Sequence, residues 1–596
     1  MRMELLRTET LLILAMLHLV TAQITMPHLC LMAYCRCDRR TREVSCLDNM
    51  FTEVPTEIPY STRTLQLIGQ NFTVLERISF NTMRSLRKLK LARDNIRSVM
   101  DDALSNVPKL KRLDMNTNFL ERVPAPVSKM TSLKELILHT NHISSLEVTT
   151  FANLTQLQIL DLEGNMIIDL PVCVFAQLWQ LAILDLSNNS ISTLSAEMFG
   201  NLSRLEELHL THNMIQHVSP GWLSSMPNVW VLQLGSALNH EFPDAGKNLL
   251  TTAGTDFLSN VELLVVSDNN LSEIPCKQFG RFPYLTHLDL SFNSIQGIPQ
   301  ACFMRLTRLV LLELNNNAIT SLEYGDFFDS YSIWTLDLSG NFIEELPPGV
   351  FIGSSLGSLD LSFNSIRRLN NESFIALDYL MELYLSSNRL EKLPKSAFRP
   401  LLSIRLIDLR LNHLTRITNQ FSNMTTLTNL GLSRNSIARI SPEAFQGCTN
   451  LRGLFLDSNR LTTVSEETFK LPNLVDVKLY DNPWHCDCRI KWMREAMSKP
   501  KKHPWMVYTD AQNVESYKGI VCASPTAFEN ISMFLIKDDE TFRLICTTYV
   551  SPLAIEFIVG ISFAIIASST LCYVAKLYCK VREMERSGAE TGKCLS

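Results

Sequence analysis

The stretch that decides the fold is residues 285–295, LTHLDLSFNSI, in which apolar residues and one asparagine hold fixed places. The same spacing occurs at Leu110–Leu120 and Leu157–Ile167, and it returns about every 24 residues from Gln70 to Asn482. We call the place of the asparagine the ladder position. Asparagine stands there at Asn118, Asn141, Asn165, Asn189, Asn213, Asn269, Asn293, Asn317, Asn341, Asn364, Asn388, Asn412, Asn435, Asn459 and Asn482. With Gln70, Asp94 and Ala237 at the same place in three further repeats, about 18 repeats are expected.

A repeat of this length predicts a solenoid, in which each unit buries its core against its neighbours. The alternating leucines predict one short strand per repeat, with the strands stacked in parallel about 4.8 Å apart. The chain turns after each strand, and the ladder amide supplies donors and an acceptor to backbone groups left inside. A second column, mostly ten residues after the ladder position, is expected to fill the convex side of the core: Phe80, Phe151, Phe175, Phe199, Trp222, Phe279, Phe303, Phe327, Phe351, Phe374, Phe398, Phe421, Phe445 and Phe469.

Together with cysteine clusters at both ends, the repeats resemble the typical class of extracellular leucine-rich repeat proteins. The motif at residues 482–488, NPWHCDC, is similar to the C-terminal cap of that family. The resemblance implies an α/β-type horseshoe solenoid with a parallel inner sheet over residues 63–482, a cap at 23–62 and a second cap at 483–547. It also implies the disulfides Cys30–Cys37, Cys35–Cys46, Cys486–Cys522 and Cys488–Cys546. Cys276 and Cys302 are a possible further pair, Cys448 is expected as a buried thiol, and Cys173 is left open.

The two ends of the chain predict export and one membrane span. An apolar run before Ala22 predicts a signal peptide at residues 1–22. The segment 553–575 is expected to cross a membrane, and the following basic residues place the tail 576–596 in the cytosol, giving a type I protein of the plasma membrane. Glycosylation sequons stand at Asn71, Asn153, Asn188, Asn201, Asn270, Asn371, Asn423 and Asn530. Asn188 adjoins a ladder residue, so its accessibility is open.

Two columns of the strands are expected to point outward and are candidates for a ligand face. The acidic one, four residues before the ladder position, includes Asp161, Asp185, Asp289, Asp337 and Asp360, and it favours a basic partner or a cation. The apolar one, two residues earlier, includes Ile159, Ile183, Val231, Leu263 and Leu311, and it favours a protein interface. The alternatives are solvated aspartates and apolar residues shielded by their neighbours.

One step breaks the regular spacing. Ala237 and Asn269 are 32 residues apart, which predicts an inserted loop containing His240, Glu241, Phe242 and Asp244. Insertions in solenoids emerge as loops and often bind partners, although a silent length variant is the alternative.

No catalytic constellation, phosphate-binding loop or metal-ligand spacing occurs, so neither an enzyme nor a cofactor or metal site is expected. The net charge of −5 is small for 596 residues and identifies no partner. The favoured function is a cell-surface adhesion or recognition receptor for an extracellular protein, with a homodimer possible and no nucleic acid involved. The alternatives are an innate immune co-receptor without its own signalling domain and an auxiliary subunit of another membrane protein.

Overall fold

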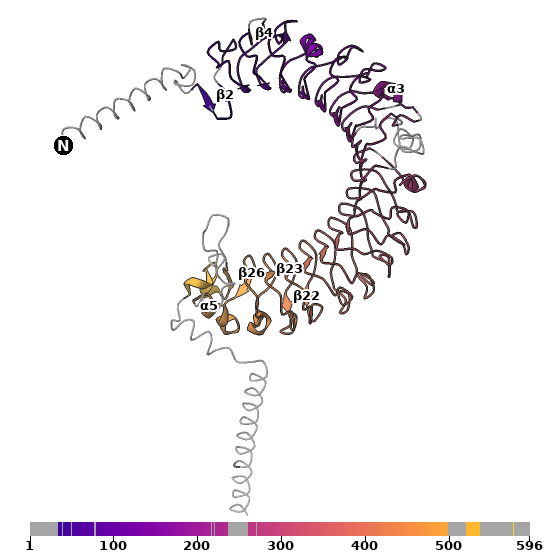
Figure 1. The fold of residues 1–596 in the computed structure, drawn as a ribbon. Helices are drawn as coiled ribbons and strands as arrows, with labels where there is room; N and C mark the ends of the chain where they lie inside the picture. Colours follow the sequence, from indigo (N-terminus) through magenta and orange to yellow (C-terminus); the bar gives the residue numbers. More distant parts are fainter. Residues whose placement is uncertain are drawn as a thin grey trace, which may run out of the picture. The chain divides into compact units, whose positions relative to one another are not determined.

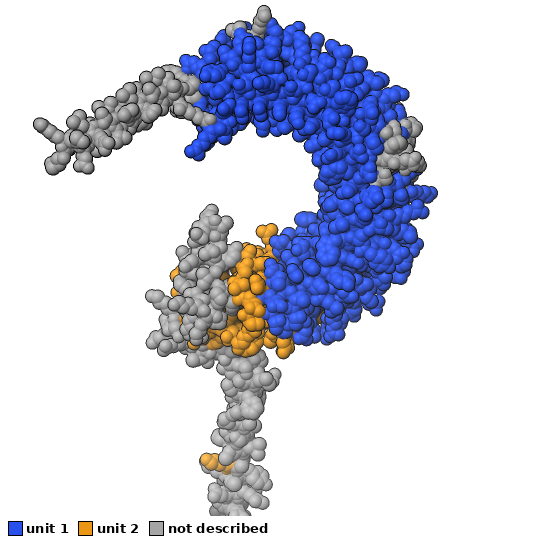
Figure 2. Space-filling model, viewed as in Figure 1, with its two compact units in different colours: residues 1–414, 419–432, 447–451 blue, residues 415–418, 433–446, 452–596 orange. Residues whose placement is uncertain are grey.

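The computed structural model describes residues 34–38, 40–48, 51–76, 79–215, 217–219, 221–223, 225–236, 260–269, 271–498, 520–536 and 576. It divides into two compact units: unit 1 comprises residues 1–414, 419–432 and 447–451, and unit 2 comprises 415–418, 433–446 and 452–596 (Figure 2). The expected signal peptide, 1–22, and membrane span, 553–575, lie outside the described residues. Within the described part of the chain, no helix is long and apolar enough to cross a membrane.

Each repeat contributes one short strand, as the alternating leucines predict. In unit 1 these strands lie along the inner side of a bend (Figure 1). They are β3 (Thr64–Ile68), β5 (Lys88–Ala92), β7 (Arg112–Asp114), β8 (Glu135–Ile137), β9 (Ile159–Asp161), β10 (Ile183–Asp185), β12 (Glu207–His209), β14 (Val231–Gln233), β15 (Leu263–Val265), β16 (His287–Asp289), β17 (Leu311–Glu313), β18 (Thr335–Asp337), β19 (Ser358–Asp360), β20 (Glu382–Tyr384), β21 (Leu406–Asp408) and β23 (Asn429–Gly431). Unit 2 contains β25 (Gly453–Phe455) and β26 (Asp476–Lys478).

Neighbouring strands pair in parallel and in register, so equivalent residues of successive repeats lie side by side. Leu288 is opposite Leu312, and Leu312 is opposite Leu336. These central leucines are buried, whereas the residues on either side of them face outward. The fold is a solenoid of about 17 turns with a parallel sheet, close to the 18 repeats expected. Eighteen ladder positions have 17 steps between them, which accounts for the difference.

The ladder asparagines make the bonds for which the sequence suggested them. Asn341 Nδ2 donates to the carbonyl oxygens of Leu314 at 2.9 Å, Leu338 at 3.1 Å and Ser339 at 3.3 Å. Its Oδ1 accepts from the amide of Ile319 at 3.0 Å. One buried side chain thus satisfies four backbone groups of two repeats, and the pattern recurs along both units.

We expect Asn341→Leu to lower the free energy of unfolding by about 1–3 kcal/mol, because it leaves these buried groups without a partner. Urea unfolding measures the loss, and amide hydrogen exchange at Ile319 localises it. Asn315→Leu in the preceding repeat removes an amide that is not at the ladder position and should change stability by less than about 0.5 kcal/mol. Equal losses in both variants would contradict this account of the ladder.

The aromatic column forms the core of the convex side, as predicted. Its rings are almost completely buried and stack between neighbouring repeats, with centroids 6.3 Å apart for Phe303 and Phe327 and 5.8 Å for Phe327 and Phe351. The convex side consists mainly of turns and 3-10 segments, and the α-helices of the described residues are only α3 (Ala196–Phe199) and α5 (Lys491–Ser498). The 3-10 segments are η1 (Ala125–Lys129), η2 (Cys276–Arg281), η3 (Glu466–Phe469), η4 (Cys488–Ile490), η7 (Thr526–Phe528) and η8 (Met533–Leu535).

Three small sheets lie in the segments that follow the ladder position. They are the two-stranded pairs β4 (Val74–Leu75) with β6 (Ser98–Val99), β11 (Thr193–Leu194) with β13 (His217–Val218), and β22 (Arg416–Ile417) with β24 (Arg439–Ile440). Each pair joins two successive repeats. The segments after the main strands are therefore linked by strand pairing at these three places along the solenoid.

Disulfides close the caps and one internal pair of repeats. The N-terminal cap pairs β1 (Cys35–Asp38) with β2 (Glu43–Leu47) and contains Cys35–Cys46. The C-terminal cap pairs β27 (Trp484–His485) with β28 (Cys522–Ser524) and contains Cys486–Cys522. Both disulfides have the connectivity that the resemblance implies.

The structure settles most of the assignments that the sequence left open for the remaining cysteines. Cys37 and Cys488 are also disulfide-bonded, and their expected partners Cys30 and Cys546 lie outside the described residues. Cys276 and Cys302 form a disulfide between neighbouring repeats, whereas Cys173 is an exposed free thiol. Cys448 is a buried free thiol, as predicted, and burial raises its pKa to about 11.

Candidate binding surface on the parallel sheet

Four carboxylates form a continuous column on the outward side of β16–β19. Asp289 is opposite Glu313, Glu313 is opposite Asp337, and Asp337 is opposite Asp360. We call Asp289, Glu313, Asp337 and Asp360 the acidic column. Parallel pairing at about 4.8 Å per strand makes the column about 14 Å long.

The aspartates of this column have a structural task that explains why Leu-Asp-Leu recurs in the sequence. Asp337 Oδ1 accepts the amide of Ser339 at 2.8 Å, and Asp360 Oδ1 accepts the amide of Ser362 at 2.7 Å. The same bond to the residue two positions on is made by Asp161, Asp185, Asp289 and Asp408. One carboxylate oxygen therefore holds the turn after the strand, and the acidic charge stays on the outward face.

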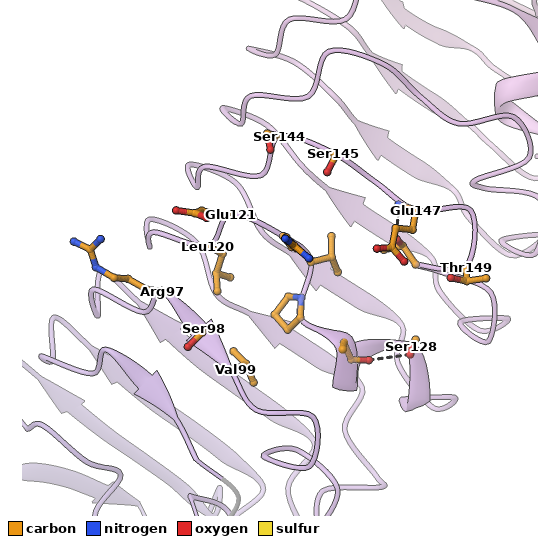
Figure 3. Close-up of a pocket in the computed structure, with 15 residues that line it drawn as sticks. Arg97, Ser98, Val99, Leu120, Glu121, Ser128, Ser144, Ser145, Glu147 and Thr149 are labelled. Carbon is orange, nitrogen blue, oxygen red and sulfur yellow. Dashed lines mark hydrogen bonds between the residues drawn. The ribbon is translucent and has the colours of Figure 1, made fainter.

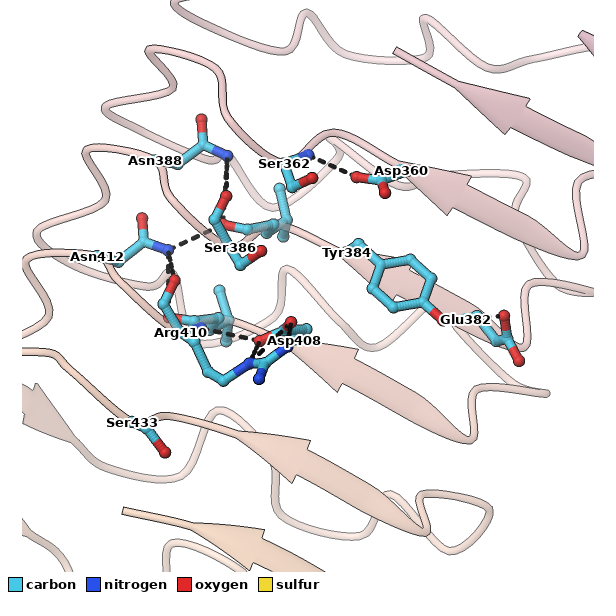
Figure 4. A network of polar contacts seen from close by, with 12 residues as sticks. Asp360, Ser362, Glu382, Tyr384, Ser386, Asn388, Asp408, Arg410, Asn412 and Ser433 are labelled. Atoms are coloured by element: carbon cyan, nitrogen blue, oxygen red, sulfur yellow. Dashed lines mark hydrogen bonds and ion pairs between the residues drawn. The ribbon is translucent and has the colours of Figure 1, made fainter. Parts of the chain in front are cut away.

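Basic side chains neutralise related carboxylates on either side of the column along the chain. Arg410 forms a bidentate pair with Asp408, 2.7 Å between Arg410 Nη2 and Asp408 Oδ2 (Figure 4). Near the N-terminal end, Lys90 Nζ lies 2.9 Å from Asp114 Oδ2, and Arg112 also contacts Asp114. The ion pairs found among the described residues include none of the four carboxylates of the acidic column.

Burial and neighbouring carboxylates raise the pKa of two members of the acidic column, Glu313 and Asp360. Burial, with Asp289 and Asp337 on either side, raises the pKa of Glu313 above its usual value. Burial likewise raises the pKa of Asp360, and Asp337 and Asp408 add to the effect. Burial and the neighbouring Glu382 raise the pKa of Tyr384 to about 12. A cationic group placed on the column would relieve this repulsion, so the surface is chemically suited to a basic ligand.

The expected apolar column offers less surface than the sequence suggested. Ile159, Ile183, Leu263 and Leu311 are only half exposed, and Val231 is buried at 4% exposure. The side chains of neighbouring strands, 4.8 Å away, cover most of each residue. The prediction of an exposed apolar column is therefore wrong for Val231 and weak for the others.

Exposed apolar residues instead lie at the two ends of the strands. Before the strands, Val310 and Trp334 are 43% and 41% exposed, and we call them the tryptophan rim. After the strands, Phe292 and Phe363 are 57% and 65% exposed, and we call them the phenylalanine rim. The acidic column thus has an apolar rim on each side.

The phenylalanine rim occupies a strained backbone position that the repeat pattern conceals. The residue before the ladder position has a left-handed conformation throughout the solenoid, with φ of 52° at Phe292 and 54° at Phe363. Glycine and asparagine tolerate that conformation, and a bulky aromatic residue does so at a cost of about 1–2 kcal/mol. Large exposed aromatic residues at such positions are candidates for a binding surface, and the repeat pattern alone did not single them out.

Two predicted site residues, Asp161 and Asp185, belong to a second acidic group, which also includes Glu163. Oxygens of Asp161, Glu163 and Asp185 lie within 4.8 Å of one another, a spacing that a divalent cation can bridge. Burial raises the pKa of Asp161 to about 6. Hydrogen bonds from the chain itself account for the arrangement, because Asp185 accepts the amide of Ser187 and Glu163 accepts the side chain of Asn188.

Of the remaining predicted site residues, most sequon asparagines are exposed, and the inserted loop lies outside the described residues. Asn153, Asn188, Asn201, Asn371, Asn423 and Asn530 are exposed, and Asn71 is half-buried. The exposure of Asn188 settles the question of its accessibility. The inserted loop with His240, Glu241, Phe242 and Asp244, and the sequon Asn270, lie outside the described residues.

A cleft of about 650 Å³ lies away from the acidic column, between the segments 97–99 and 144–150 (Figure 3). It occurs where Ser128 stands in place of an aromatic residue, and Pro124 lies between its walls. In the preceding repeat, Met100 donates its amide to Leu75 and pairs β6 with β4; the equivalent Pro124 has no amide hydrogen to give to Val99. The lining is mainly polar and charged and includes Arg97, Arg122, Glu121 and Glu147.

Comparison with known proteins agrees with this architecture. The profile of the leucine rich repeat family matches residues 61–120, 131–189, 179–239, 259–319, 283–343, 331–390, 378–437 and 425–483, more than half of the chain. The protein therefore belongs to the leucine-rich repeat family. This fold and family are typically non-enzymatic binding scaffolds.

Individual relatives match only in part. Trophoblast glycoprotein of Macaca fascicularis is 33% identical over 134 residues, 21% of this chain and 31% of that protein. Asporin of Bos taurus is 27% identical over 100 residues, 17% of this chain and 27% of that protein. The chain thus spans less than a third of the length of either curated relative. In the Drosophila Toll–Spatzle complex, one chain superimposes with a TM-score of 0.55 at 22% identity, covering 80% of this chain and 60% of that chain, which shows the shared fold alone.

Proposed function

We propose that this protein is a cell-surface recognition protein that binds an extracellular protein through the sheet face of its repeats. The observation that carries the proposal is the acidic column, four neighbouring carboxylates that no basic side chain of the described residues neutralises. Leaving such a column unpaired costs stability in the free protein, and a basic partner would recover that cost. Hydrogen bonds to the turns explain one oxygen of each aspartate in the column, but they supply no counter-charge. Two strands further on, Arg410 supplies such a charge to Asp408.

Export and membrane anchoring are part of the same proposal. Disulfides in both caps and between Cys276 and Cys302 favour an oxidising compartment. The signal peptide at 1–22, the span at 553–575 and the tail at 576–596 follow from the sequence pattern and complete a type I topology. The Toll structure is a complex of that protein with Spatzle, and this supports a protein ligand for the present chain.

The test is proximity labelling on intact cells that display the full-length chain. The variant D289N/E313Q/D337N/D360N neutralises the acidic column, and we expect it to lose the extracellular proteins that the unaltered chain labels. D101N/E372Q/D378N/E391Q removes the same number of charges from other exposed sites and should retain them. If both variants label the same proteins as the unaltered chain, the sheet face does not recognise the partner.

A further inference from the structure

The tryptophan rim depends on one glycine. Trp334 donates its amide to the carbonyl of Val310 at 2.9 Å, and Gly357 donates its amide to the carbonyl of Trp334 at 2.8 Å. Val310, Trp334 and Gly357 therefore lie side by side at the same place of three successive repeats, just before β17, β18 and β19.

The indole ring of Trp334 packs against Gly357. A Cβ atom at residue 357 would lie 2.0 Å from Trp334 Cε2 and 2.2 Å from Cζ2. The backbone of Gly357 is not left-handed, so its conformation does not require glycine. The missing side chain therefore provides room for Trp334, which rests on the next repeat with 41% of its surface exposed.

The indole lies just before the strand whose last residue, Asp337, belongs to the acidic column. Trp334 precedes Asp337 by three residues, about 10 Å along an extended chain, with Thr335 and Leu336 of β18 between them. A ligand segment that pairs with Asp337 can therefore also reach Trp334 with another side chain, and tryptophan attracts apolar groups as well as guanidinium and ammonium groups. An apolar rim beside an acidic column favours a ligand that carries both apolar and basic side chains.

This part of the solenoid is also the richest in exposed aromatic residues. Eight of the fourteen exposed aromatic side chains among the described residues lie between 271 and 370. The sequence contains no sequon between Asn270 and Asn371, although sequons occur on both sides. N-linked glycans are bulky, so the surface of these repeats would stay accessible in an exported protein.

We propose that the tryptophan rim and the acidic column together bind an extended basic segment of a protein partner. The segment crosses β16–β19, places an apolar side chain on Val310 and Trp334, and presents Lys or Arg at alternate positions to the carboxylates. Alternate residues of an extended chain are about 7 Å apart, so three of them span the roughly 14 Å of the acidic column. This inference rests on the proposed function and names the chemistry of its partner.

A second copy of this chain is a poorer occupant. Its sheet residues Lys90 and Arg112 already contact Asp114, and its net charge is −5, so two copies repel weakly. Charge complementarity therefore favours a different, basic protein.

The probe is a fluorescent peptide of alternating lysine and leucine, measured by anisotropy on the purified full-length chain at near-physiological salt. Two comparison peptides replace leucine by serine or lysine by glutamate. We expect the lysine–leucine peptide to bind, and Gly357→Ala and Trp334→Ala each to weaken it on the order of tenfold. D289N/E313Q/D337N/D360N should abolish its salt-dependent binding.

Matched controls separate the rim from general damage. Gly297→Ala adds a methyl group where nothing lies within 4 Å, and Trp179→Ala removes an exposed tryptophan of another repeat; both should bind normally. Near-UV circular dichroism should change in Gly357→Ala with unaltered thermal stability, as expected for a displaced indole.

Each other outcome overturns the inference. Normal binding to Trp334→Ala, or equal binding of the lysine–serine or glutamate–leucine peptide, removes the combined apolar and basic requirement. A dimer in sedimentation that Trp334→Ala abolishes assigns the surface to a second copy. In these cases the proposed function still stands if the acidic-column variant loses its partners in cells, and it fails with the inference if that variant keeps them.

Discussion

Phe327→Ala is expected to lower the free energy of unfolding by about 3–5 kcal/mol, the range for an aromatic residue removed from a packed core. Phe327 is fully buried, with its ring between those of Phe303 and Phe351, 6.3 Å and 5.8 Å away between centroids. The cavity removes contacts with both neighbouring repeats. In a solenoid the interfaces between repeats hold the array together, so the loss should divide the unfolding transition rather than shift it uniformly. Urea unfolding with hydrogen exchange by repeat measures both effects.

Phe328→Ala is the matched control, because the adjacent ring is exposed. Its effect should remain within about 0.5 kcal/mol, as for surface substitutions generally. Similar losses at residues 327 and 328 would mean that the aromatic column is not the core of the convex side.

Asp94→Asn is expected to stabilise the N-terminal repeats at neutral pH. Asp94 holds a ladder position and is completely buried. Its Oδ1 accepts the amide of Gln70 at 2.7 Å, and its Oδ2 has no hydrogen-bond partner. At the equivalent place in the next repeat, Asn118 Nδ2 donates to carbonyls of Leu91, Met115 and Asn116. A carboxyl group can donate a hydrogen bond to such carbonyl oxygens only when it is protonated.

The sign of the pH dependence follows from the pKa. Burial raises the pKa of Asp94 from 3.8 to about 7, although the amide of Gln70 and the charge of Arg93 oppose the shift. Below about pH 4 the carboxyl is protonated in both folded and unfolded chains, so it costs nothing. As the pH rises to 7 the unfolded chain ionises first, and stability is lost progressively. Since one pKa unit corresponds to about 1.4 kcal/mol, the loss above pH 7 is on the order of 4 kcal/mol.

The measurement is urea unfolding of the unaltered chain and Asp94→Asn between pH 4 and pH 8. The variant should match the unaltered chain at pH 4 and exceed its stability increasingly up to pH 7. Asn341→Asp is the reciprocal variant and should acquire the pH dependence that Asp94→Asn loses. A constant difference between the two chains across this range would show that Asp94 is ionised throughout.

Asp94 also shows which properties of a residue can be predicted from the sequence and which cannot. The repeat spacing located it as a substituted ladder residue among asparagines, which is enough to mark it as unusual. Its protonation depends on complete burial and on an oxygen without a donor, and both arise from the repeats stacked on either side. A pattern along one chain contains no measure of either quantity.

The candidate surface divides in the same way. The column of carboxylates was predicted from Leu-Asp-Leu, because strand periodicity alone places those residues outward. The apolar column was predicted by the same rule, and it was weak because neighbouring strands cover side chains that periodicity leaves exposed. Trp334 and Gly357 stand at the same phase of adjacent repeats, a signal that a comparison of columns before the strand would have found.

The sequence by itself determined the solenoid, its repeat length, the ladder asparagines and the aromatic core, whereas the pairing of the cap cysteines came from the family resemblance. The features of the solenoid are periodic, because each repeat needs the same contacts to bury its core. The same residue pattern therefore recurs in every repeat. Only the tertiary structure decided which carboxylates have a counter-charge, how Gly357 leaves room for Trp334, and that Asp94 Oδ2 lacks a hydrogen-bond donor. The contact of Trp334 with Gly357 and the environment of Asp94 join residues about 24 positions apart, and they exist only once neighbouring repeats are stacked in register.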